Sequence, residues 1–275
     1  MTRLTDAGSL NNIAKKVTPQ IGTAVQVLGM SNGIELFVSY LNLLVGKGSG
    51  SGWDKTETTA TADVIRHSCC SDHPTVIDCG ANRGNWMNKL RHNLGTDNGR
   101  WIAIEPAHEN VQLLQSLPNI EVIEAAVGER VEELKLYSNN SGSEWASLHE
   151  RNDSFTQGHE FSVRTVSVIM IDSLIADKGL DHVDFMKMDI EGHELFALRG
   201  AMRSLSDGRI KALSFEFGSG NVNSRTFFRD FWDLLHPLGF EFRRICPGGA
   251  TIPVKNYYED LEVFRGVTNY IAILR

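Results

Sequence analysis

From about residue 74 onward, short apolar runs alternate with stretches whose apolar residues recur at helical spacing. The runs read TVIDCG, RWIAIEP, IEVIEAAVG, VDFMKMDI and IKALSFEF. Short apolar runs between turn residues predict buried strands, and near-continuous apolar strands separated by helices are typical of a parallel sheet covered on both faces. The stretches between the runs predict helices over residues 85–94, 108–116, 191–205 and 223–235. We therefore expect an α/β fold.

The C-terminal part adds two more apolar runs, GFEFRRICP and TNYIAILR. Both predict strands, which we expect to form a hairpin that finishes the sheet. The expected core is then a mostly parallel seven-stranded sheet with helices on both faces and a terminal antiparallel strand. One region departs from the alternation: residues 131–168 predict two strands, at about 133–138 and 161–168, on either side of a long polar loop. Long loops in compact domains are often functional, so we expect this insertion to hold substrate contacts.

The first 45 residues carry another pattern, in which Ile34, Phe37, Leu41 and Leu44 recur at spacings of 3, 4 and 3. This spacing predicts one apolar face of an amphipathic helix. The segment GKGSGSG that follows predicts a flexible connector.

These patterns predict two parts, a helical extension with its connector over residues 1–60 and a main domain over residues 61–275. The helices of the extension would cap the binding site or form a homodimer surface. Either role buries Phe37, Tyr40 and Leu41.

Composition and charge narrow the possible partners. The 275-residue chain has a formal net charge of −7, which argues against a nucleic-acid backbone as the main partner. The polar start shows no secretory signal, and the longest apolar region, residues 21–45, is interrupted by Gln26, Gly29, Asn32 and Glu35. A membrane span needs about 20 mostly apolar residues, so we expect none. Four cysteines do not indicate a disulfide framework, and we expect a cytoplasmic protein.

The first strand leads into a glycine turn, VIDCGANRGN, that contains Asp78, Gly80 and Gly84. Glycines let a backbone bend tightly and approach a ligand, and a following helix N-terminus offers free N–H groups. The turn lacks the middle glycine of the dinucleotide fingerprint G-x-G-x-x-G. An acid before the turn suits a cationic cofactor better than a pyrophosphate. The pattern resembles the first motif of S-adenosylmethionine (SAM)-dependent methyltransferases.

The next two strands support a nucleoside ligand. Glu105 ends the second strand, 21 residues after Gly84, where an acid commonly holds a ribose hydroxyl pair. The third strand ends in EAAVG, where Ala125 and Ala126 leave room for an adenine ring.

With VIDCGANRGNW, AIEPAHEN, EAAVG and VDFMKMDIEGHELFALRGA in this order, the chain resembles the FkbM-type methyltransferases. The resemblance implies a Rossmann-like class I methyltransferase fold and SAM-dependent O-methylation. It is carried most specifically by Asp189, Ile190, Glu191, Gly192 and Glu194. The implied SAM contacts, together with their neighbours in the same segments, are Asp78, Gly80, Ala81, Asn82, Gly84, Asn85, Glu105, Pro106 and Ala126.

Two acids at strand ends are candidates for the chemistry. Asp189 and Glu216 follow neighbouring strands, so both carboxylates are expected at the crevice where open α/β sheets bind ligands. Such a pair suits a divalent metal such as Mg²⁺, which would chelate the oxygens of a hydroxylated acceptor. The metal-free alternative uses His193, or a histidine of the insertion (His149 or His159), as the base. Glu191 and Glu194 are assigned mainly to the first turn of a helix, where acids are stabilised by the dipole.

The leading hypothesis is therefore a SAM-dependent O-methyltransferase that acts on a hydroxyl of a small acceptor, either a sugar or glycan unit or a secondary metabolite. The alternatives are an RNA or protein methyltransferase and a non-catalytic SAM-fold binding protein. RNA-directed enzymes usually carry a basic module, and N-methylating enzymes often carry a Pro-Pro-aromatic loop where this chain reads DIEGHE. A nicotinamide dehydrogenase is disfavoured by the missing middle glycine.

Overall fold

The computed structural model describes residues 18, 21–22, 25, 29–48, 54–69, 71–139, 146–151 and 158–275. The chain divides into two units, residues 1–42 and 43–275. Helix α2 (Ser31–Leu44) includes the apolar spacing that predicted a helix there, and none of its residues is buried. In the single chain Phe37 is 60% exposed and Tyr40 56%. Most of the helical region expected before α2 lies outside the described residues.

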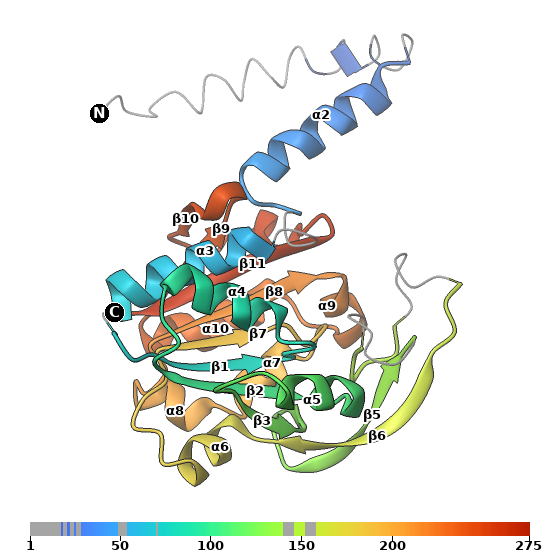
Figure 1. Cartoon of the computed structure of the whole chain (residues 1–275). Helices are drawn as coiled ribbons and strands as arrows, with labels where there is room; N and C mark the ends of the chain where they lie inside the picture. The colour runs from blue at the N-terminus through green and yellow to red at the C-terminus, as the bar shows by residue number, and fades with distance from the viewer. Residues whose placement is uncertain are drawn as a thin grey trace. The chain divides into compact units, whose positions relative to one another are not determined.

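The second unit is built on an eight-stranded sheet (Figure 1). Its strands are β1 (Thr75–Cys79), β2 (Arg100–Glu105), β3 (Glu121–Glu124), β7 (Phe185–Met188), β8 (Ala212–Gly218), β9 (Phe240–Ile245), β10 (Thr251–Val254) and β11 (Val267–Leu274). Their order is β10-β9-β11-β8-β7-β1-β2-β3, and β3, β2, β1, β7 and β8 run parallel. Strand β11 enters between β8 and β9 and is antiparallel to both. All seven predicted strands are present, and β10 adds an eighth at the edge through its antiparallel pairing with β9.

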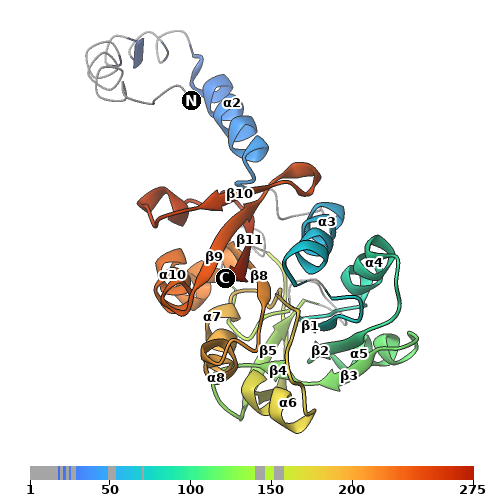
Figure 2. The ribbon, with the colours of Figure 1, turned by 90° about the vertical axis from the view of Figure 1, so that its left-hand side faces the viewer.

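Helices cover both faces of this sheet, as the apolar strands require (Figure 2). One face packs against α3 (Asp54–Val64), α4 (Asn85–Leu94) and α5 (His108–Gln115). The other packs against α6 (Ile171–Asp177), α7 (Glu194–Arg199), α8 (Met202–Ser206) and α10 (Phe228–Leu235). Helix α9 (Ser219–Ser224) follows β8, and short helical turns lie at Ile65–Cys69, His236–Leu238, Pro247–Gly249 and Glu259–Glu262. Helix α3 packs against α4. The predicted division of the chain into residues 1–60 and 61–275 stays a prediction. Among the described helices, none is both long enough and apolar enough to cross a bilayer.

Two predicted helices are interrupted in the structure. The helix expected over residues 191–205 is split into α7 and α8 and begins only at Glu194, because Glu191 and Gly192 have left-handed backbone angles (φ 54° and 100°). The break falls at Gly200, where a Cβ atom would lie 2.0 Å from the Gly128 carbonyl oxygen. The helix expected over 223–235 is replaced by α9 and α10, separated at Arg225 (φ 57°).

The insertion contributes two strands to a second sheet beside the first, which confirms the two strands predicted there. This sheet contains β4 (Ala126–Val127), which precedes the insertion, with β5 (Glu132–Ser138) and β6 (Ser162–Ile169), in the order β4-β6-β5. Strands β5 and β6 pair antiparallel along their whole length. Leu136, Val166 and Val168 pack with Ala126 in a small core of their own. The insertion is thus anchored where the third strand of the main sheet ends.

Candidate active site

A pocket opens at the carboxyl ends of the parallel strands. Its lining combines small and aliphatic side chains with acidic ones. The apolar lining residues include Ala125, Ala126, Val127, Leu136 and Leu148, and the acidic ones are Glu105, Asp189 and Glu191. The predicted residues Gly80, Asn82, Glu105, Pro106 and Ala126 line the pocket. Asp78, Ala81, Gly84 and Asn85 are not among its lining residues.

The glycine turn brings two acidic strand ends into contact. Gly80 has a φ of 78°, and a Cβ atom on it would lie 2.0 Å from the backbone oxygen of Asp189. Only glycine satisfies both conditions, since side chains disfavour positive φ and the space is already filled. The N–H groups of Gly80 and Ala81 both donate to the Ile104 carbonyl oxygen (2.9 and 3.1 Å). The ends of β1, β2 and β7 are therefore fixed against one another.

Glu105 holds the turn and faces the pocket at the same time. Its Oε2 accepts a hydrogen bond from the Asn82 N–H and its Oε1 accepts one from the Ala107 N–H, each at 2.8 Å. The side chain is only 5% exposed, and burial raises its pKa while these backbone donors lower it. Each carboxylate oxygen can accept two hydrogen bonds, so Oε2 retains capacity for one from a ligand hydroxyl.

Asp78 is buried and is not among the residues that line the pocket. Its side chain is fully buried, and neither carboxylate oxygen has a hydrogen-bond partner among the described residues. The ammonium group of Lys187 lies 3.7 Å from Asp78 Oδ1 and 2.9 Å from Asp189 Oδ2. Burial raises the pKa of Asp78 to about 6, although the Lys187 charge opposes this. The charge of Asp78 is thus balanced inside the protein, so the sequence-based reason for placing it against a cofactor cation is weakened.

Three carboxylates gather beside the pocket, and two of them, Asp189 and Glu191, line it. Oxygen atoms of Asp189, Glu191 and Glu216 all lie within 4.8 Å of one another. Burial raises the pKa of Glu216 well above its usual value, and the negative charges of Asp189 and Glu191 raise it further. The structure therefore brings the two predicted catalytic acids together and adds Glu191.

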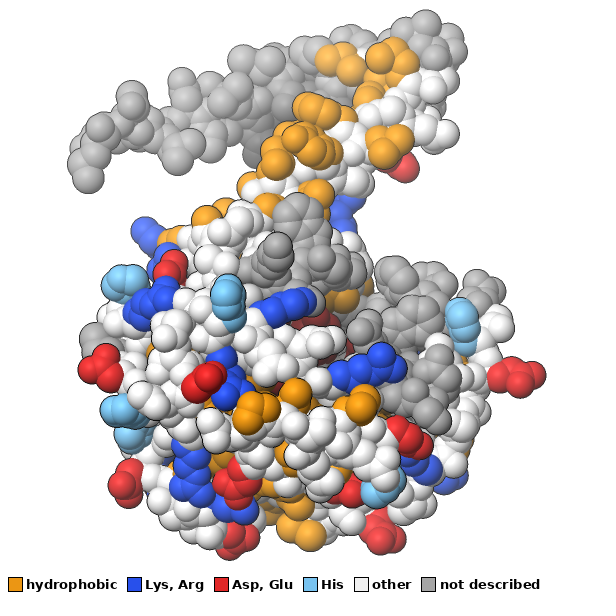
Figure 3. All heavy atoms as spheres, viewed as in Figure 1, with side chains coloured by type: hydrophobic (Ala, Val, Ile, Leu, Met, Phe, Trp, Pro, Cys, Tyr) orange, Lys and Arg blue, Asp and Glu red, His pale blue; other side chains and the backbone are white. Residues whose placement is uncertain are grey.

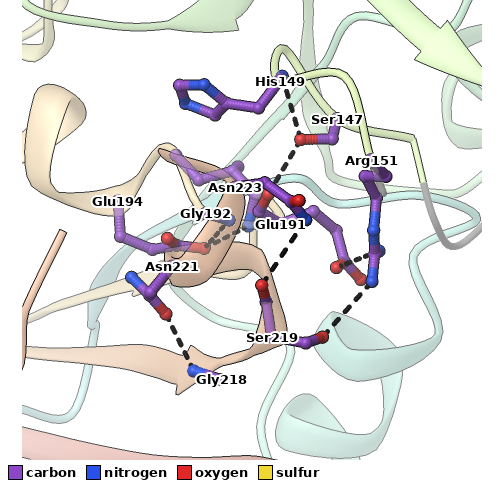
Figure 4. Close-up of polar contacts among 11 residues, drawn as sticks. Ser147, His149, Arg151, Glu191, Gly192, Glu194, Gly218, Ser219, Asn221 and Asn223 are labelled. Atoms are coloured by element: carbon purple, nitrogen blue, oxygen red, sulfur yellow. Dashed lines mark hydrogen bonds and ion pairs between the residues drawn. The ribbon is translucent and has the colours of Figure 1, made fainter. Parts of the chain in front are cut away.

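The turn that carries Glu191 is held from two sides (Figure 4). From the insertion, Arg151 Nη1 donates to Glu191 Oε2 at 2.6 Å, and Ser147 Oγ donates to the Glu191 carbonyl oxygen at 2.8 Å. From the helix, Glu194 Oε1 accepts from the Ile190 and Gly192 N–H groups, both at 3.1 Å. The assignment of Glu191 to the first helical turn is wrong, because its left-handed backbone lies before α7 and its carboxylate lines the pocket. Glu194 is the first residue of α7, and it stabilises the turn.

A comparison with known proteins decides the family. The model of the methyltransferase FkbM domain matches residues 78–242, more than half of the chain. The chain belongs to the FkbM methyltransferase family. No curated protein matches it.

Several solved methyltransferase structures are similar to this FkbM-family chain, all at low identity. A methyltransferase FkbM from Methylobacillus flagellatus KT is 19% identical with a TM-score of 0.48, over 80% of this chain and 49% of that one. The chain therefore spans about half the length of that relative. A precorrin-6y C5,15-methyltransferase from Geobacter metallireducens is 13% identical with a TM-score of 0.40, over 79% and 87%. A fibrillarin from Aeropyrum pernix, with natively bound SAM, is 12% identical with a TM-score of 0.40, over 80% and 76%.

In this FkbM-family chain, His193 does not line the pocket. Its Nδ1 lies 3.0 Å from His149 Nε2, and its ring stacks on Phe196 with the centroids 4.6 Å apart. Burial, followed by the neighbouring His149, lowers the pKa of His193 to about 3, so the ring is neutral at pH 7. His159 is exposed. None of the three candidate histidines is among the residues that line the pocket.

The sequence interpretation of this FkbM-family site missed three charged residues. Lys187 lies within the apolar strand β7 and is 4% exposed, and Arg151 in the insertion is 7% exposed. Glu57 of α3 accepts a hydrogen bond from Ser214 Oγ at 3.0 Å, and burial raises its pKa to about 7. A lysine in the middle of the run FMKM is a signal that could have been used, because an unpaired buried ammonium group is very costly. Arg151 and Glu57 gave no comparable signal.

Proposed function

We propose that this FkbM-family protein is a SAM-dependent O-methyltransferase that acts on a hydroxyl of a small acceptor, either a sugar or glycan unit or a secondary metabolite. The observation that carries the proposal is the meeting of Asp189, Glu191 and Glu216 beside a pocket that is also lined by small and aliphatic side chains. The ring faces of adenine pack well on such side chains, and the cationic sulfonium of SAM is stabilised by nearby carboxylates.

The residues of the pocket fit SAM. Ala126, Val127 and Leu148 offer an apolar surface for adenine, and Glu105 offers an acceptor for a ribose hydroxyl. The carboxylates of Asp189 and Glu191 suit the positive charges on the sulfur and the amino group of SAM. When bound, SAM supplies an electrophilic methyl group, and no covalent intermediate with the protein is required. The remaining task of the chain is to orient the acceptor oxygen and to remove its proton.

Asp189 and Glu216 are suited to that proton removal. A hydroxyl is a very weak acid, so the base must be held close to it. Asp189 lines the pocket, and Glu216 lies beside it with its pKa raised by burial. Lys187 donates to Asp189 Oδ2 and keeps that carboxylate in place. We assign Asp189 as the residue that faces the acceptor and Glu216 as the one that shares its proton.

A divalent cation such as Mg²⁺ is a second way to use the same carboxylates. Asp189, Glu191 and Glu216 would hold it through oxygen ligands, which Mg²⁺ prefers, and the ion would make a coordinated hydroxyl more acidic. Treatment with a chelator separates the two mechanisms: transfer that is lost and then restored by Mg²⁺ favours the metal, and unchanged transfer favours the carboxylate base.

The proposal is tested with labelled SAM and a panel of glycans and phenolic compounds. We expect label on a hydroxyl oxygen, and we expect Asp189→Asn to reduce transfer at saturating SAM by about 100-fold or more. Asp177→Asn, at the exposed end of α6, is the matched control. Label found only on nitrogen, protein or RNA would overturn the O-methyl assignment. Tight SAM binding without any transfer would favour the non-catalytic alternative, and NAD binding in place of SAM would remove the cofactor assignment.

A further inference from the structure

The charged side chains around the pocket do not contribute equally to its surface. Among the described residues, Glu105, Asp189 and Glu191 line the pocket with carboxylates, and no lysine or arginine lines it. The basic partners of two of these acids, Lys187 and Arg151, are only 4% and 7% exposed and are not lining residues. The outer surface is different, because basic and acidic side chains are interspersed on the face that Figure 3 shows. The acidic lining is therefore a property of the pocket.

The two basic side chains do not cancel the negative charge that faces the pocket. The Lys187 ammonium group lies 2.9 Å from Asp189 Oδ2 and 3.7 Å from Asp78 Oδ1, so one positive charge serves two carboxylates. Arg151 Nη1 donates to Glu191 Oε2 at 2.6 Å. Coulomb interactions weaken with distance, so carboxylates at the lining act on a bound cation more strongly than basic groups that do not reach it. The pocket thus favours a positively charged ligand.

SAM and its demethylated product differ at the sulfur atom. The sulfur is a cationic sulfonium in SAM and a neutral thioether in the product, whereas the adenine, the ribose and the amino-acid part are the same. We propose that Asp189 and Glu191 are specificity-determining residues that make this chain bind SAM more tightly than its demethylated product. The inference rests on the proposed function only in taking SAM as the cofactor.

The methyl transfer itself removes the basis of this preference. The S–C bond breaks with its electron pair left on the sulfur, a bond from the methyl carbon to the acceptor oxygen forms, and the acceptor hydroxyl gives up its proton. The sulfur becomes neutral and loses its attraction to Asp189 and Glu191 in the same step. Product release limits the turnover of many enzymes. A product that is held less tightly than SAM is exchanged for SAM readily, so this arrangement of charge limits product inhibition.

Titration calorimetry of the full chain measures the affinities of SAM, its demethylated product and the analogue sinefungin. In sinefungin a carbon atom that bears an amine replaces the methylated sulfur, so the positive charge is retained without a sulfonium. All titrations share one pH and one ionic strength, because salt screens charge interactions. The wild type is expected to bind SAM and sinefungin at least about tenfold more tightly than the product, which corresponds to about 1.4 kcal/mol.

Matched variants assign the preference to the pocket. Glu191→Gln removes a negative charge but keeps an oxygen that can accept from Arg151. It is expected to weaken the binding of SAM and sinefungin about tenfold and to change product binding by less than about threefold. Glu133→Gln removes a carboxylate at an exposed position of β5 and is expected to change none of the three affinities. Asp189→Asn carries the same expectation as Glu191→Gln and replaces it if that variant does not fold.

The possible results separate charge from other sources of affinity. A product that binds the wild type as tightly as SAM overturns the inference, and so does a preference for SAM that sinefungin does not share. Unchanged SAM affinity in the variants, or an equal loss for all three ligands, overturns the role of the two acids. A chain that binds none of the ligands overturns the inference together with the cofactor assignment. A chain that shows the expected preference but methylates no acceptor supports the inference and refutes only the proposed transfer.

Discussion

The replacement Glu105→Gln tests whether Glu105 organises the glycine turn where we propose that the nucleoside of SAM binds. The Glu105 carboxylate accepts hydrogen bonds from two backbone N–H groups, of Asn82 and Ala107, at 2.8 Å each. A glutamine side chain has one oxygen, so its amide can accept from only one of these donors, and its NH₂ group then faces the other N–H. The N–H group of Asn82 in the glycine turn and that of Ala107 before α5 therefore cannot both donate to the glutamine side chain.

The magnitude follows from these two contacts. A hydrogen bond to a charged group contributes about 1.5–3 kcal/mol, and a buried donor left without a partner costs about 1–3 kcal/mol. We expect the turn of the variant to lose about 3 kcal/mol of stabilisation and to relax in the ligand-free chain, so that SAM must restore its ordered form on binding. Each 1.4 kcal/mol is a factor of ten in affinity, so SAM binding should weaken by about 100-fold.

Calorimetry with SAM and with its demethylated product measures this change. Glu133→Gln, at an exposed position of β5, removes a carboxylate of the same size and should leave the affinity unchanged. If Glu105→Gln binds both nucleosides within about threefold of the wild type, then Glu105 neither organises the turn nor contacts the ligand, and the assignment of this pocket fails.

Three further predictions concern the supports of the site. Burial raises the pKa of Glu194 to about 7 in the folded chain, above its usual 4.5, so the folded state favours the protonated acid and stability falls as the pH rises from 4.5 through 7. Glu194→Gln retains the oxygen that accepts from the turn, so its free energy of unfolding should exceed that of the wild type at pH 8, by on the order of 3 kcal/mol, and be close to it at pH 4; a lower value at pH 8 would contradict this. Gly80→Ala should abolish measurable SAM binding. Gly95 also has a positive φ (70°, against 78° at Gly80) but open space around it, so Gly95→Ala should lose only about 1 kcal/mol of stability and bind normally. Arg151→Met should lower the rate of methyl transfer about tenfold by releasing Glu191, with partial recovery in Arg151→Lys; steady-state kinetics at the wild-type rate would show that the ion pair is dispensable.

Some of this protein could be inferred from the order of its residues alone. The alternating apolar runs predicted seven strands, and all seven are present because a strand buried on both faces must be apolar nearly throughout. The glycine turn and the acids after strand ends predicted the edge of the sheet where the pocket lies, since parallel strands end at a common edge. The FkbM resemblance agrees with the family to which the chain belongs.

Other features depend on contacts between distant parts of the chain. The spacing of Leu195, Leu198 and Met202 fits one helix, but the close approach of the Gly128 carbonyl oxygen at Gly200 divides it. Tertiary contacts of this kind override a local periodicity, because no local signal reports what packs against a backbone.

The sequence by itself determined the α/β core, the acidic glycine turn and the family, because these follow from periodicity and from residues close together in the chain. Only the tertiary structure decided which acids face the pocket. Asp78 is paired internally with Lys187, while Glu191, which lines the pocket, is paired with Arg151, 40 residues away in sequence. The environment of a charge is set by its neighbours in space, and those neighbours come from different strands, helices and the insertion.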